Sequence, residues 1–532
     1  MGGMDANRDG NTEHGGRRYA ITFDAGTTAI KCALVRDDGM VAAASSGELD
    51  LVADGGRREQ SPAQRWEVFR TVCRATLGKA EETEPGFADR LTAGRAGDAA
   101  ARGGASLIAG VIMSGQMQDV IALDDGLRPV RDAILYSDGR ADEEAAALAA
   151  CLGGGGESGA CVGMEWFLET VGNRLEGCLP LPKLMWMRTH EGESYARTAH
   201  VLISSKDWLN ARLTGVCADD VAACSTAGAM GIRAGAWDAR LCAASGVDPA
   251  LLPALHDPQD VIGAVRPDAA SATGIPAGTP VHAGFGDAGA TTFASGVTRP
   301  GDYNINLGTS GWVATVSPEP FTDGAGAANL RYGVAPGFVN AVPFLNAGDV
   351  HRWAVRTLAG GDYAAAHRLL AASRPGAGGV LCLPYLVGER FPVMNPDVRG
   401  GFVGISPTTT PGDLLRAALE GVALSIRQGM EGFDEPPARI TLIGGGARET
   451  VWCQVMADAL GHPVVAFGNA DILPAVALAS LVFADPGLPD KVRASAMYRP
   501  DPAAVAVYDR AYPRFTRLCP ALSGLARFRN RV

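Results

Sequence analysis

Two short segments with the same pattern, far apart in the chain, constrain the fold most. Residues 19–39, YAITFDAGTTAIKCALVRDDG, contain an apolar run, a turn of glycine and threonine, and a second apolar run. Residues 301–316, GDYNINLGTSGWVATV, repeat this order. Short apolar runs on both sides of such turns are typical of β-hairpins. Two similar hairpins about 280 residues apart predict two similar domains that face one another.

The length and the order of the predicted elements agree with two large domains. A chain of 532 residues exceeds the roughly 250 to 300 at which one hydrophobic core stops growing. Apolar spacing predicts helices over 62–78, 180–214 and 411–432, and the run SLIAGVIMSG (106–115) predicts a buried strand. Glu-, Ala- and Gly-rich residues up to about 105 are expected to form a surface insertion. Strands that alternate with helices predict an α/β architecture.

Charge and composition exclude several classes of partner. The chain carries 47 basic and 58 acidic side chains, a net charge of −11, and no Lys/Arg block, which argues against nucleic acid. No apolar run reaches the roughly 18 residues that span a bilayer, and residues 1–17, an expected disordered tail, lack the apolar core of a signal peptide. The eleven scattered cysteines include no CxxC pair. We therefore expect a cytoplasmic protein with reduced thiols.

Both turns combine backbone N–H groups with hydroxyls, which suits an anionic phosphate. Their residues are Gly26, Thr27 and Thr28 in the first turn and Gly308, Thr309 and Ser310 in the second. Asp24, beside the first turn, would repel a bare phosphate and suits Mg²⁺ instead. Alone, such a turn is also ordinary hairpin chemistry. A pair of them favours a nucleotide whose phosphates lie between two domains, and the chain has no P-loop motif for this purpose.

In this context five ordered motifs resemble those of the FGGY family of carbohydrate kinases, from residue 19 to about 485. The motifs are DAGTTAIK (24–31) and LGTSG (307–311) for phosphate, LIGGGARETVWCQVMADALG (442–461) for adenosine, and the two family signatures LPLPKLMWMRTH (179–190) and GGFVGISPTTTPGDLLRAALEG (400–421). The resemblance implies two ribonuclease-H-like α/β domains of the actin, Hsp70 and sugar kinase superfamily around a central cleft.

The resemblance also implies which sites each domain carries. Residues 18–296 form the N-terminal domain, with the sugar site, the first phosphate motif and the catalytic aspartate. Residues 297–532 form the C-terminal domain, with the second phosphate motif and the adenosine site, and the hinge lies near residue 297. ATP and Mg²⁺ are the implied cofactors, with Asp24 at the metal. The implied nucleotide-binding residues are Asp24, Gly26, Thr27, Thr28, Lys31, Gly308, Thr309, Ser310, Gly444, Gly445, Gly446 and Ala447.

The segment HAGFGDAGATT (282–292) places Asp287 after a strand and between glycines. Transfer of a phosphoryl group to a sugar hydroxyl uses a base that accepts the hydroxyl proton. From the residues alone, Asp287 is either this base or a cap of the following helix. The family resemblance assigns the base to Asp287.

The implied sugar pocket departs from the xylulokinase pattern at two positions. Its residues are Gln116, Met117, Gln118, Tyr136 and Asp287. Gln118 stands where xylulokinase-like members have His, and Tyr136 where the family has Trp. Asp138 and Arg140 are retained and either line the pocket or form a buried pair that braces its loop. Glu389 and Arg390, in the Gly-Glu-Arg-x-Pro segment, either close the cleft or hold a domain contact, and for Arg390 a simple salt bridge is the favoured interpretation.

The resemblance predicts an ATP-dependent kinase that acts on an alcohol group of a small carbohydrate. The favoured substrate is a D-xylulose-like ketose. Gluconate and erythritol or another polyol remain alternatives within the family. From another class, a non-catalytic sensor that binds nucleotide and sugar also stays open, although retention of Asp287 argues against a dead kinase. The expected partner is a small-molecule carbohydrate, and a homodimer is left open.

Overall fold

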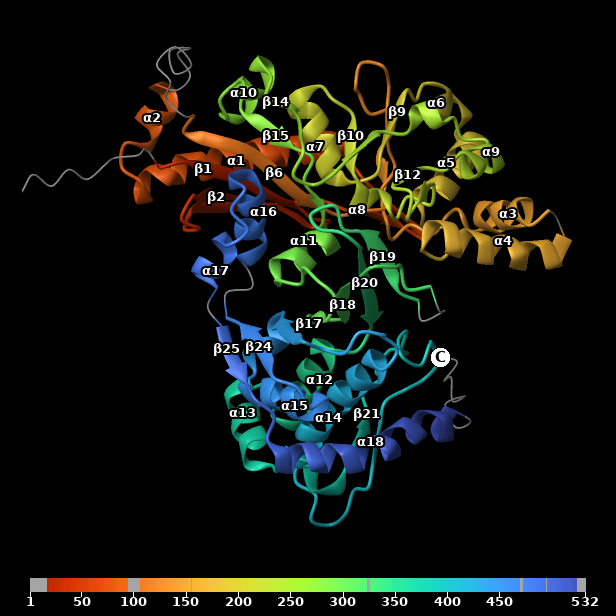
Figure 1. Cartoon of the computed structure of the whole chain (residues 1–532), viewed down its shortest axis with the longest axis vertical. Coiled ribbons are helices and arrows are strands. Elements are labelled where there is room, and N and C mark those ends of the chain that lie inside the picture. The colour runs from red at the N-terminus through yellow and green to blue at the C-terminus, as the bar shows by residue number, and fades with distance from the viewer. Residues whose placement is uncertain are drawn as a thin grey trace, which may run out of the picture.

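The computed structural model describes residues 17–93, 106–154, 156–322, 326–468, 472–493 and 495–523. Two seven-stranded sheets, one from each half of the chain, form its framework, with helices packed around them (Figure 1). In the view of Figure 1 the N-terminal sheet lies in the upper part and the C-terminal sheet in the lower part. The predicted α/β architecture with two similar halves is confirmed.

The N-terminal sheet has the strand order β14-β15-β6-β1-β2-β3, and β16 also pairs with β6. Its strands are β1 (Tyr19–Ala25), β2 (Ala29–Arg36), β3 (Val41–Glu48), β6 (Ile108–Gly115), β14 (Val261–Ala264), β15 (Pro280–His282) and β16 (Phe285–Gly286). The predicted first hairpin is β1 with antiparallel β2. The run 106–115 forms β6, whose last six residues are buried and which pairs parallel to β1. This places the first Gly-Thr turn at the end of a central strand.

The C-terminal sheet has the order β19-β20-β18-β17-β23-β24-β25. Its strands are β17 (Asp302–Leu307), β18 (Gly311–Ser317), β19 (Ala328–Arg331), β20 (Phe338–Phe344), β23 (Arg439–Ile443), β24 (Val464–Phe467) and β25 (Ser495–Tyr498). Here β17 is antiparallel to β18 and parallel to β23, as β1 is to β2 and β6. The internal echo in the sequence therefore corresponds to the same strand arrangement in both sheets.

Smaller strand pairs and a set of helices complete the two halves. The remaining strands are β4 (Val52–Asp54), β5 (Arg57–Gln60), β7 (Ile121–Leu123), β8 (Ala133–Ile134), β9 (His200–Leu202), β10 (Ala218–Asp220), β11 (Met230–Gly231), β12 (Ala236–Trp237), β13 (Ala254–His256), β21 (Leu381–Leu383) and β22 (Gly401–Val403). The helices of the N-terminal half are α1 (Pro62–Thr83), α2 (Phe87–Ala93), α3 (Asp142–Leu152), α4 (Gly156–Val171), α5 (Pro180–His190), α6 (Gly192–Ala196), α7 (Ser205–Thr214), α8 (Val221–Cys224), α9 (Ala239–Ser245), α10 (Pro267–Thr273) and α11 (Asp287–Ala294).

The helices of the C-terminal half include the long central α14, which follows the predicted 411–432 pattern. These helices are α12 (Gly348–Leu358), α13 (Tyr363–Ala372), α14 (Pro411–Met430), α15 (Thr450–Leu460), α16 (Leu473–Phe483), α17 (Leu488–Val492) and α18 (Pro502–Ser523). Thr410 and Asp413 form a capping box at the start of α14, which satisfies two otherwise unpaired backbone N–H groups. The signature residue Glu420 is buried and accepts hydrogen bonds from Arg416, Tyr508 and the Gly376 N–H.

Four sequence expectations need correction or limitation. Residues 180–214 are not one helical region, because β9 separates α6 from α7 and pairs with β7. The predicted end at residue 214 is confirmed, since α7 ends at Thr214 and Gly215 has the left-handed conformation. Helix α1 runs beyond the predicted residue 78 to Thr83. The expected insertion continues as α2, whose Phe87 is buried, and residues 94–105 lie outside the described residues. The expected tail likewise lies outside them up to residue 16.

The two halves are joined by more than the segment near residue 297. Helices α16 and α17 follow β24 in the chain but pack on the N-terminal sheet, where Val476 and Leu488 join the cluster of Ala20 and Val35. A second contact joins the end of α4 to β19. Asn173 Nδ2 donates to the Asn329 carbonyl, and the Asn329 N–H donates back to Asn173 Oδ1. The domain boundary at residue 297 stays a prediction, since chain segments cross between the halves.

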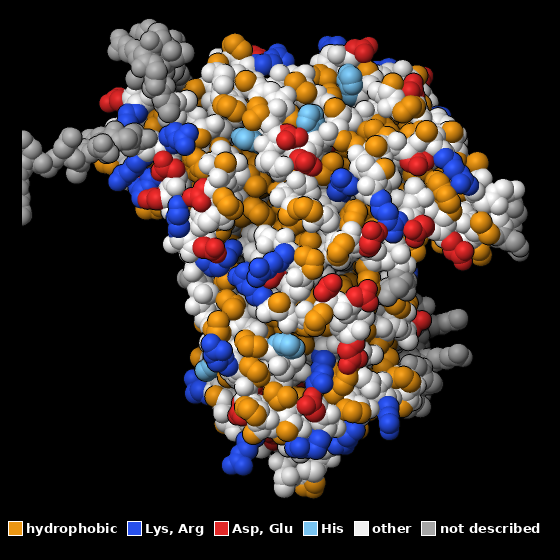
Figure 2. Space-filling view, in the orientation of Figure 1, with side chains coloured by type: hydrophobic (Ala, Val, Ile, Leu, Met, Phe, Trp, Pro, Cys, Tyr) orange, Lys and Arg blue, Asp and Glu red, His pale blue; other side chains and the backbone are white. Residues whose placement is uncertain are grey.

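The surface face in Figure 2 mixes acidic and basic side chains, with no broad area of one sign. In the same view the lobe of α3 and α4 projects at the side, and the outline narrows below it, where the two halves meet (Figure 2). Among the helices of the described residues, none is both long and apolar enough to cross a membrane.

Candidate active site

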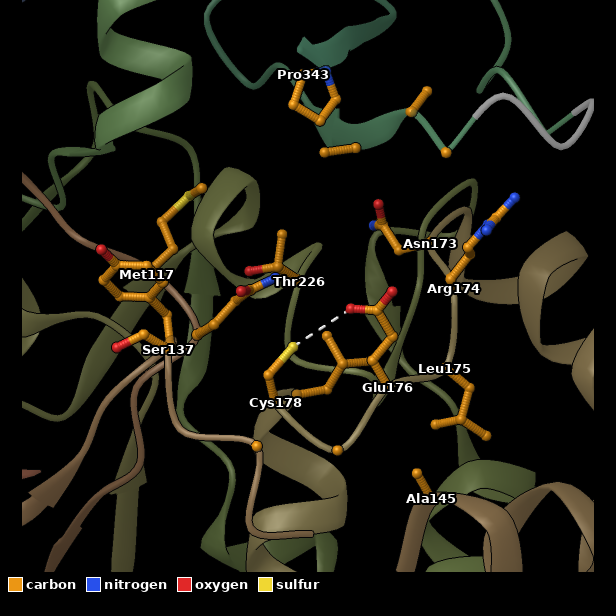
Figure 3. A pocket seen from close by; sticks show the side chains of 18 of the residues that line it. Met117, Ser137, Ala145, Asn173, Arg174, Leu175, Glu176, Cys178, Thr226 and Pro343 are labelled. Carbon is orange, nitrogen blue, oxygen red and sulfur yellow. Dashed lines mark hydrogen bonds between the residues drawn. The ribbon is translucent and has the colours of Figure 1, made fainter. Parts of the chain in front are cut away.

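A cavity of about 1100 Å³ lies where the two halves meet and contains the predicted base. The predicted sugar-site residues Gln116, Met117, Gln118, Tyr136 and Asp287 all line it, together with Thr27 of the first phosphate turn. The C-terminal half contributes Leu330, Ala341, Pro343 and Arg390. In Figure 3, Pro343 lies across the cavity from Cys178 and Ala145. The structure thus brings together residues that are up to about 360 positions apart in the chain.

Asp287 is the first residue of α11, and its exposed side chain lines the cavity. Loss of water around the carboxyl, caused by the neighbouring protein, raises its pKa to about 7, and the negative charges of Asp24 and Asp220 add to the effect. Its Oδ1 accepts a hydrogen bond from the Ala288 N–H at 2.7 Å. Gly286, not Asp287, occupies the N-cap position of α11. Asp287 is therefore not the N-cap of α11, and its role as the base stays a prediction.

Glycines allow the chain to bring Asp287 to this place. Gly284 has φ +79°, and a Cβ there would lie 2.2 Å from the Met113 carbonyl oxygen. At Gly286 a Cβ would lie 2.3 Å from Met117 Sδ. Residues 284–287 therefore pack directly against β6 and against the sugar segment, which is the part of the chain around Met117. Side chains at Gly284 and Gly286 would prevent this close contact.

Buried polar groups hold the first phosphate turn in place. Gln60 Nε2 donates to the Thr27 carbonyl at 2.7 Å, and Arg65 Nη1 donates to the Gly26 carbonyl at 3.1 Å. The Thr27 hydroxyl donates to Gln116 Oε1 at 2.5 Å, and Gln116 Nε2 donates to Asp119 Oδ2 at 2.7 Å. Gln116 is buried, so the structure uses its side chain to connect the phosphate turn to the sugar segment.

The remaining residues predicted around the first turn are more exposed. The Asp24 carboxylate is 41% exposed, accepts from Ser114 Oγ at 3.3 Å and lies 3.6 Å from Lys31 Nζ. The exposed Thr28 lies at the tip of the hairpin. An exposed carboxylate beside a Gly-Thr turn has the oxygen ligands that Mg²⁺ prefers, so the residues present fit the metal that the family uses.

The second phosphate turn lies between β17 and β18 and leaves its hydroxyls exposed. The carbonyls of Gly308 and Thr309 accept hydrogen bonds from the N–H groups of Gly348 and Asp349, where α12 begins. Thr309 and Ser310 are exposed. These contacts fix the turn from one side and leave two hydroxyls available to a phosphate.

The glycines of the adenosine motif follow β23 and lead into the short 3₁₀ helix η4 (Gly445–Arg448). A Cβ at Gly444, which has φ +90°, would meet Asn306 Oδ1 at 2.7 Å, and one at Gly446 would meet the Trp452 ring at 2.5 Å. Apart from chain neighbours, no described atom would lie within 4 Å of a Cβ at Gly445. This open space beside a glycine backbone fits a purine. Trp452 and Met456, on the following helix, are fully buried.

The signature lysine supports the sugar segments. Lys183 is fully buried, and its Nζ donates to the carbonyls of Gln118 at 3.0 Å and Leu135 at 2.7 Å. Burial lowers its pKa to about 8, although the negative charge of Asp119 opposes this effect. Gln118 has φ +64°, an uncommon value for a residue with a side chain. Lys183 therefore ties together the two segments that carry Gln118 and Tyr136.

Of the two alternatives for Asp138 and Arg140, the bracing pair is present. Asp138 is fully buried, its Oδ1 accepts from Arg140 Nε at 2.8 Å, and its Oδ2 accepts from the Arg58 N–H at 2.6 Å. The signature residue Trp186 lies under the Arg140 guanidinium, 4.8 Å from it. The pair orients the loop that exposes Tyr136 to the cavity.

The salt bridge favoured for Arg390 is absent among the described residues. Arg390 is exposed and lines the cavity, whereas Glu389 is buried and accepts from the Leu345 N–H and Asn346 Nδ2. Sequence reasoning also missed Asn173, Arg174, Thr226 and Ala288 as cavity residues. Their only sequence signal is proximity to recognised motifs, because the folding of distant segments decides which side chains face the cavity.

Comparisons with known proteins show the family of the chain. Residues 19–294 match the FGGY family of carbohydrate kinases, N-terminal domain, and residues 303–480 match its C-terminal domain. The xylulose kinase of Klebsiella pneumoniae is 30% identical over 520 residues, 95% of this chain and 99% of that protein. The gluconokinase of Bacillus subtilis is 28% identical over 464 residues, 84% of each chain.

A solved structure gives the same result in three dimensions. The crystal structure of xylulose kinase from Rhodospirillum rubrum superposes with a TM-score of 0.82 at 30% sequence identity, and the match covers 96% of this chain and all of that one. Both family domains are thus present in order, with the fold that five motifs predicted. The chain belongs to the FGGY family of carbohydrate kinases.

Proposed function

We propose that this carbohydrate kinase transfers the terminal phosphoryl group of ATP to a hydroxyl of a D-xylulose-like ketose. One observation carries the proposal: Asp287, Thr27 and the sugar segment around Met117 line a single cavity. The similarity to the xylulose kinases of Klebsiella pneumoniae and Rhodospirillum rubrum supports the choice of a ketose. Membership of the kinase family sets aside the non-catalytic sensor.

In the proposed mechanism Asp287 accepts the proton of the attacking sugar hydroxyl. ATP would supply the phosphoryl group, and a bound Mg²⁺ would balance the charge of its phosphates. The metal would lie at Asp24, and the phosphates between the turns at Gly26 and Gly308. Tyr136 and Met117 would orient the sugar so that its hydroxyl reaches the Asp287 carboxylate. Alignment within one enclosed site supplies most of the rate enhancement in such a reaction, and closure of the two halves would exclude water.

A sugar acid is the second candidate, and a specific observation favours it. Arg174 lines the cavity from the N-terminal half and Arg390 from the C-terminal half. Guanidinium groups bind carboxylates strongly, often through two parallel hydrogen bonds. The similarity to the gluconokinase of Bacillus subtilis points in the same direction.

The test is ADP formation by the purified protein with Mg²⁺-ATP across a substrate panel. The panel contains D-xylulose, L-xylulose, D-ribulose, gluconate, erythritol and glycerol, with a reaction without sugar as control. We expect D-xylulose to raise the rate furthest above the control. If gluconate does so instead, the sugar acid is the substrate, and if no compound does, the proposed substrate range is wrong.

The pH dependence provides a further prediction. A raised pKa means that the neutral form of the Asp287 carboxyl persists to higher pH, and the neutral form cannot accept a proton. We therefore expect kcat/KM for the sugar to reach a plateau above about pH 7 and to fall towards tenfold per unit below it. Initial rates from about pH 5.5 to about pH 9 at saturating Mg²⁺-ATP measure this. A flat profile over this range would contradict the assignment.

A further inference from the structure

A fully buried group of one lysine and three aspartates lies behind the turn that carries Asp287. Lys206 and Asp207 lie in the first turn of α7, and Asp219 and Asp220 lie at the end of β10. All four side chains are fully buried. Burial of charge costs free energy unless the groups are paired and hydrogen-bonded, and the proposed mechanism uses none of these residues. Buried charged groups of this kind are common at functional sites, so we consider what this cluster contributes to the candidate site.

Within the cluster, Lys206 pairs with two carboxylates. Its Nζ lies 2.5 Å from Asp207 Oδ1 and 2.8 Å from Asp220 Oδ2. Burial raises the pKa of Asp219 well above its usual range, and the negative charge of Asp207 adds to this effect. The Lys206 ammonium orients Asp207 and Asp220 through its contacts with both carboxylates.

Asp220 in turn contacts the segment that carries Asp287. Its Oδ1 accepts from the N–H groups of Ala222 at 3.0 Å and Ala223 at 3.1 Å, as the N-cap of α8. The same oxygen accepts from the Gly286 N–H at 3.4 Å. Gly286 immediately precedes Asp287, so one carboxylate oxygen connects the start of α8 to the turn of the proposed base.

We propose that Asp220, oriented by Lys206, is a positioning residue that holds the Gly286–Asp287 turn against α8 and acts on the Asp287 carboxyl through its negative charge. The proposal rests on the proposed role of Asp287 as base. The other carboxylate that faces Asp287 is Asp24 on β1. The titratable groups around Asp220 are Lys206 and Asp207 on α7, Asp219 on β10, Cys224 on α8, Asp257 after β13 and Asp287 on α11.

The decisive variant is Asp220→Asn, which keeps an oxygen for the three N–H donors and removes the charge. Loss of a nearby negative charge favours the ionised form of Asp287. The acid limb of the kcat/KM profile is therefore expected to move to lower pH, by about half a unit to one unit. Lys206→Met removes the positive charge and is expected to move the limb to higher pH. A role limited to folding would change stability without these opposite shifts.

Asp238→Asn is the matched control. Asp238 is the N-cap of α9 and accepts from the N–H groups of Arg240 and Leu241, so the same substitution is made in the same kind of cap away from the cavity. We expect it to leave the pH profile unchanged. Thermal unfolding of each variant separates effects on stability from effects on the profile.

The outcomes separate this proposal from the proposed function. An Asp220→Asn variant that folds and has the wild-type pH midpoint overturns the proposal, even if its rate is lower. If Asp220→Asn does not fold, Lys206→Met decides: a shift to higher pH supports the proposal and an unchanged midpoint overturns it. If the wild type phosphorylates no sugar, the proposed function fails instead.

Discussion

Replacement of Asp287 by asparagine is expected to lower kcat by a factor on the order of 10² to 10⁴, the usual contribution of a general base. The amide keeps the size of the side chain but cannot accept the hydroxyl proton. Asp287 lines the cavity with the sugar segment, whereas the predicted adenosine residues lie elsewhere, so nucleotide binding should persist. Single-turnover transfer and the affinity for ADP, measured on the same preparation, check both parts.

The matched control for this variant is Asp268→Asn, the same substitution at an exposed site on α10 that does not line the cavity. It should retain wild-type turnover. An Asp287→Asn enzyme whose kcat stays within a few-fold of the wild type would show that another group accepts the proton. The role assigned to Asp287, and with it the mechanism, would then be wrong.

Replacement of Gly445 by valine is expected to raise KM for ATP at least tenfold, which corresponds to about 1.4 kcal/mol of lost binding. The site leaves room for the side chain within the protein, since no described atom beyond the chain neighbours lies within 4 Å of a Cβ there. Fold and stability should therefore change little, and the valine would occupy the space proposed for adenine. KM for the sugar should not change. Steady-state kinetics with each substrate varied in turn measures these values.

Gly192→Val provides the comparison, because Gly192 on α6 also has open space around a Cβ but lies outside the proposed site. It should leave both KM values unchanged. Neighbouring Gly444 and Gly446 are unsuitable for this test, because a Cβ at either position would collide with the protein itself. An unchanged KM for ATP in Gly445→Val would place the adenine elsewhere.

Local patterns in the sequence were enough to predict the elements that form the framework. The strand–turn–strand pattern predicts a hairpin from neighbouring residues alone, and both hairpins are present. The stripe of Trp66, Phe69 and Val72 predicts α1, and the whole stripe is buried. Such patterns depend on spacing within one element, which the sequence records directly.

Expectations that depended on distant partners were less successful. Residues 200–202 lie within a pattern that reads as helical, but they form β9 because β7, about 80 residues earlier, supplies its hydrogen-bond partner. Arg390 was expected to form an ion pair and instead lines the cavity. The spacing of nearby residues predicts neither outcome.

The sequence by itself determined the family, the two hairpins and the identity of the motif residues, because each is a property of short, contiguous segments. Only the tertiary structure decided that Thr27 and Arg390 line the same cavity as the predicted sugar-pocket residues, and that the buried Lys206 and Asp220 lie behind the turn of Asp287. The physical reason is that these proximities come from the pairing of β1, β6 and β16 and from contact between the two halves. Burial and charge at the site follow from those long-range contacts.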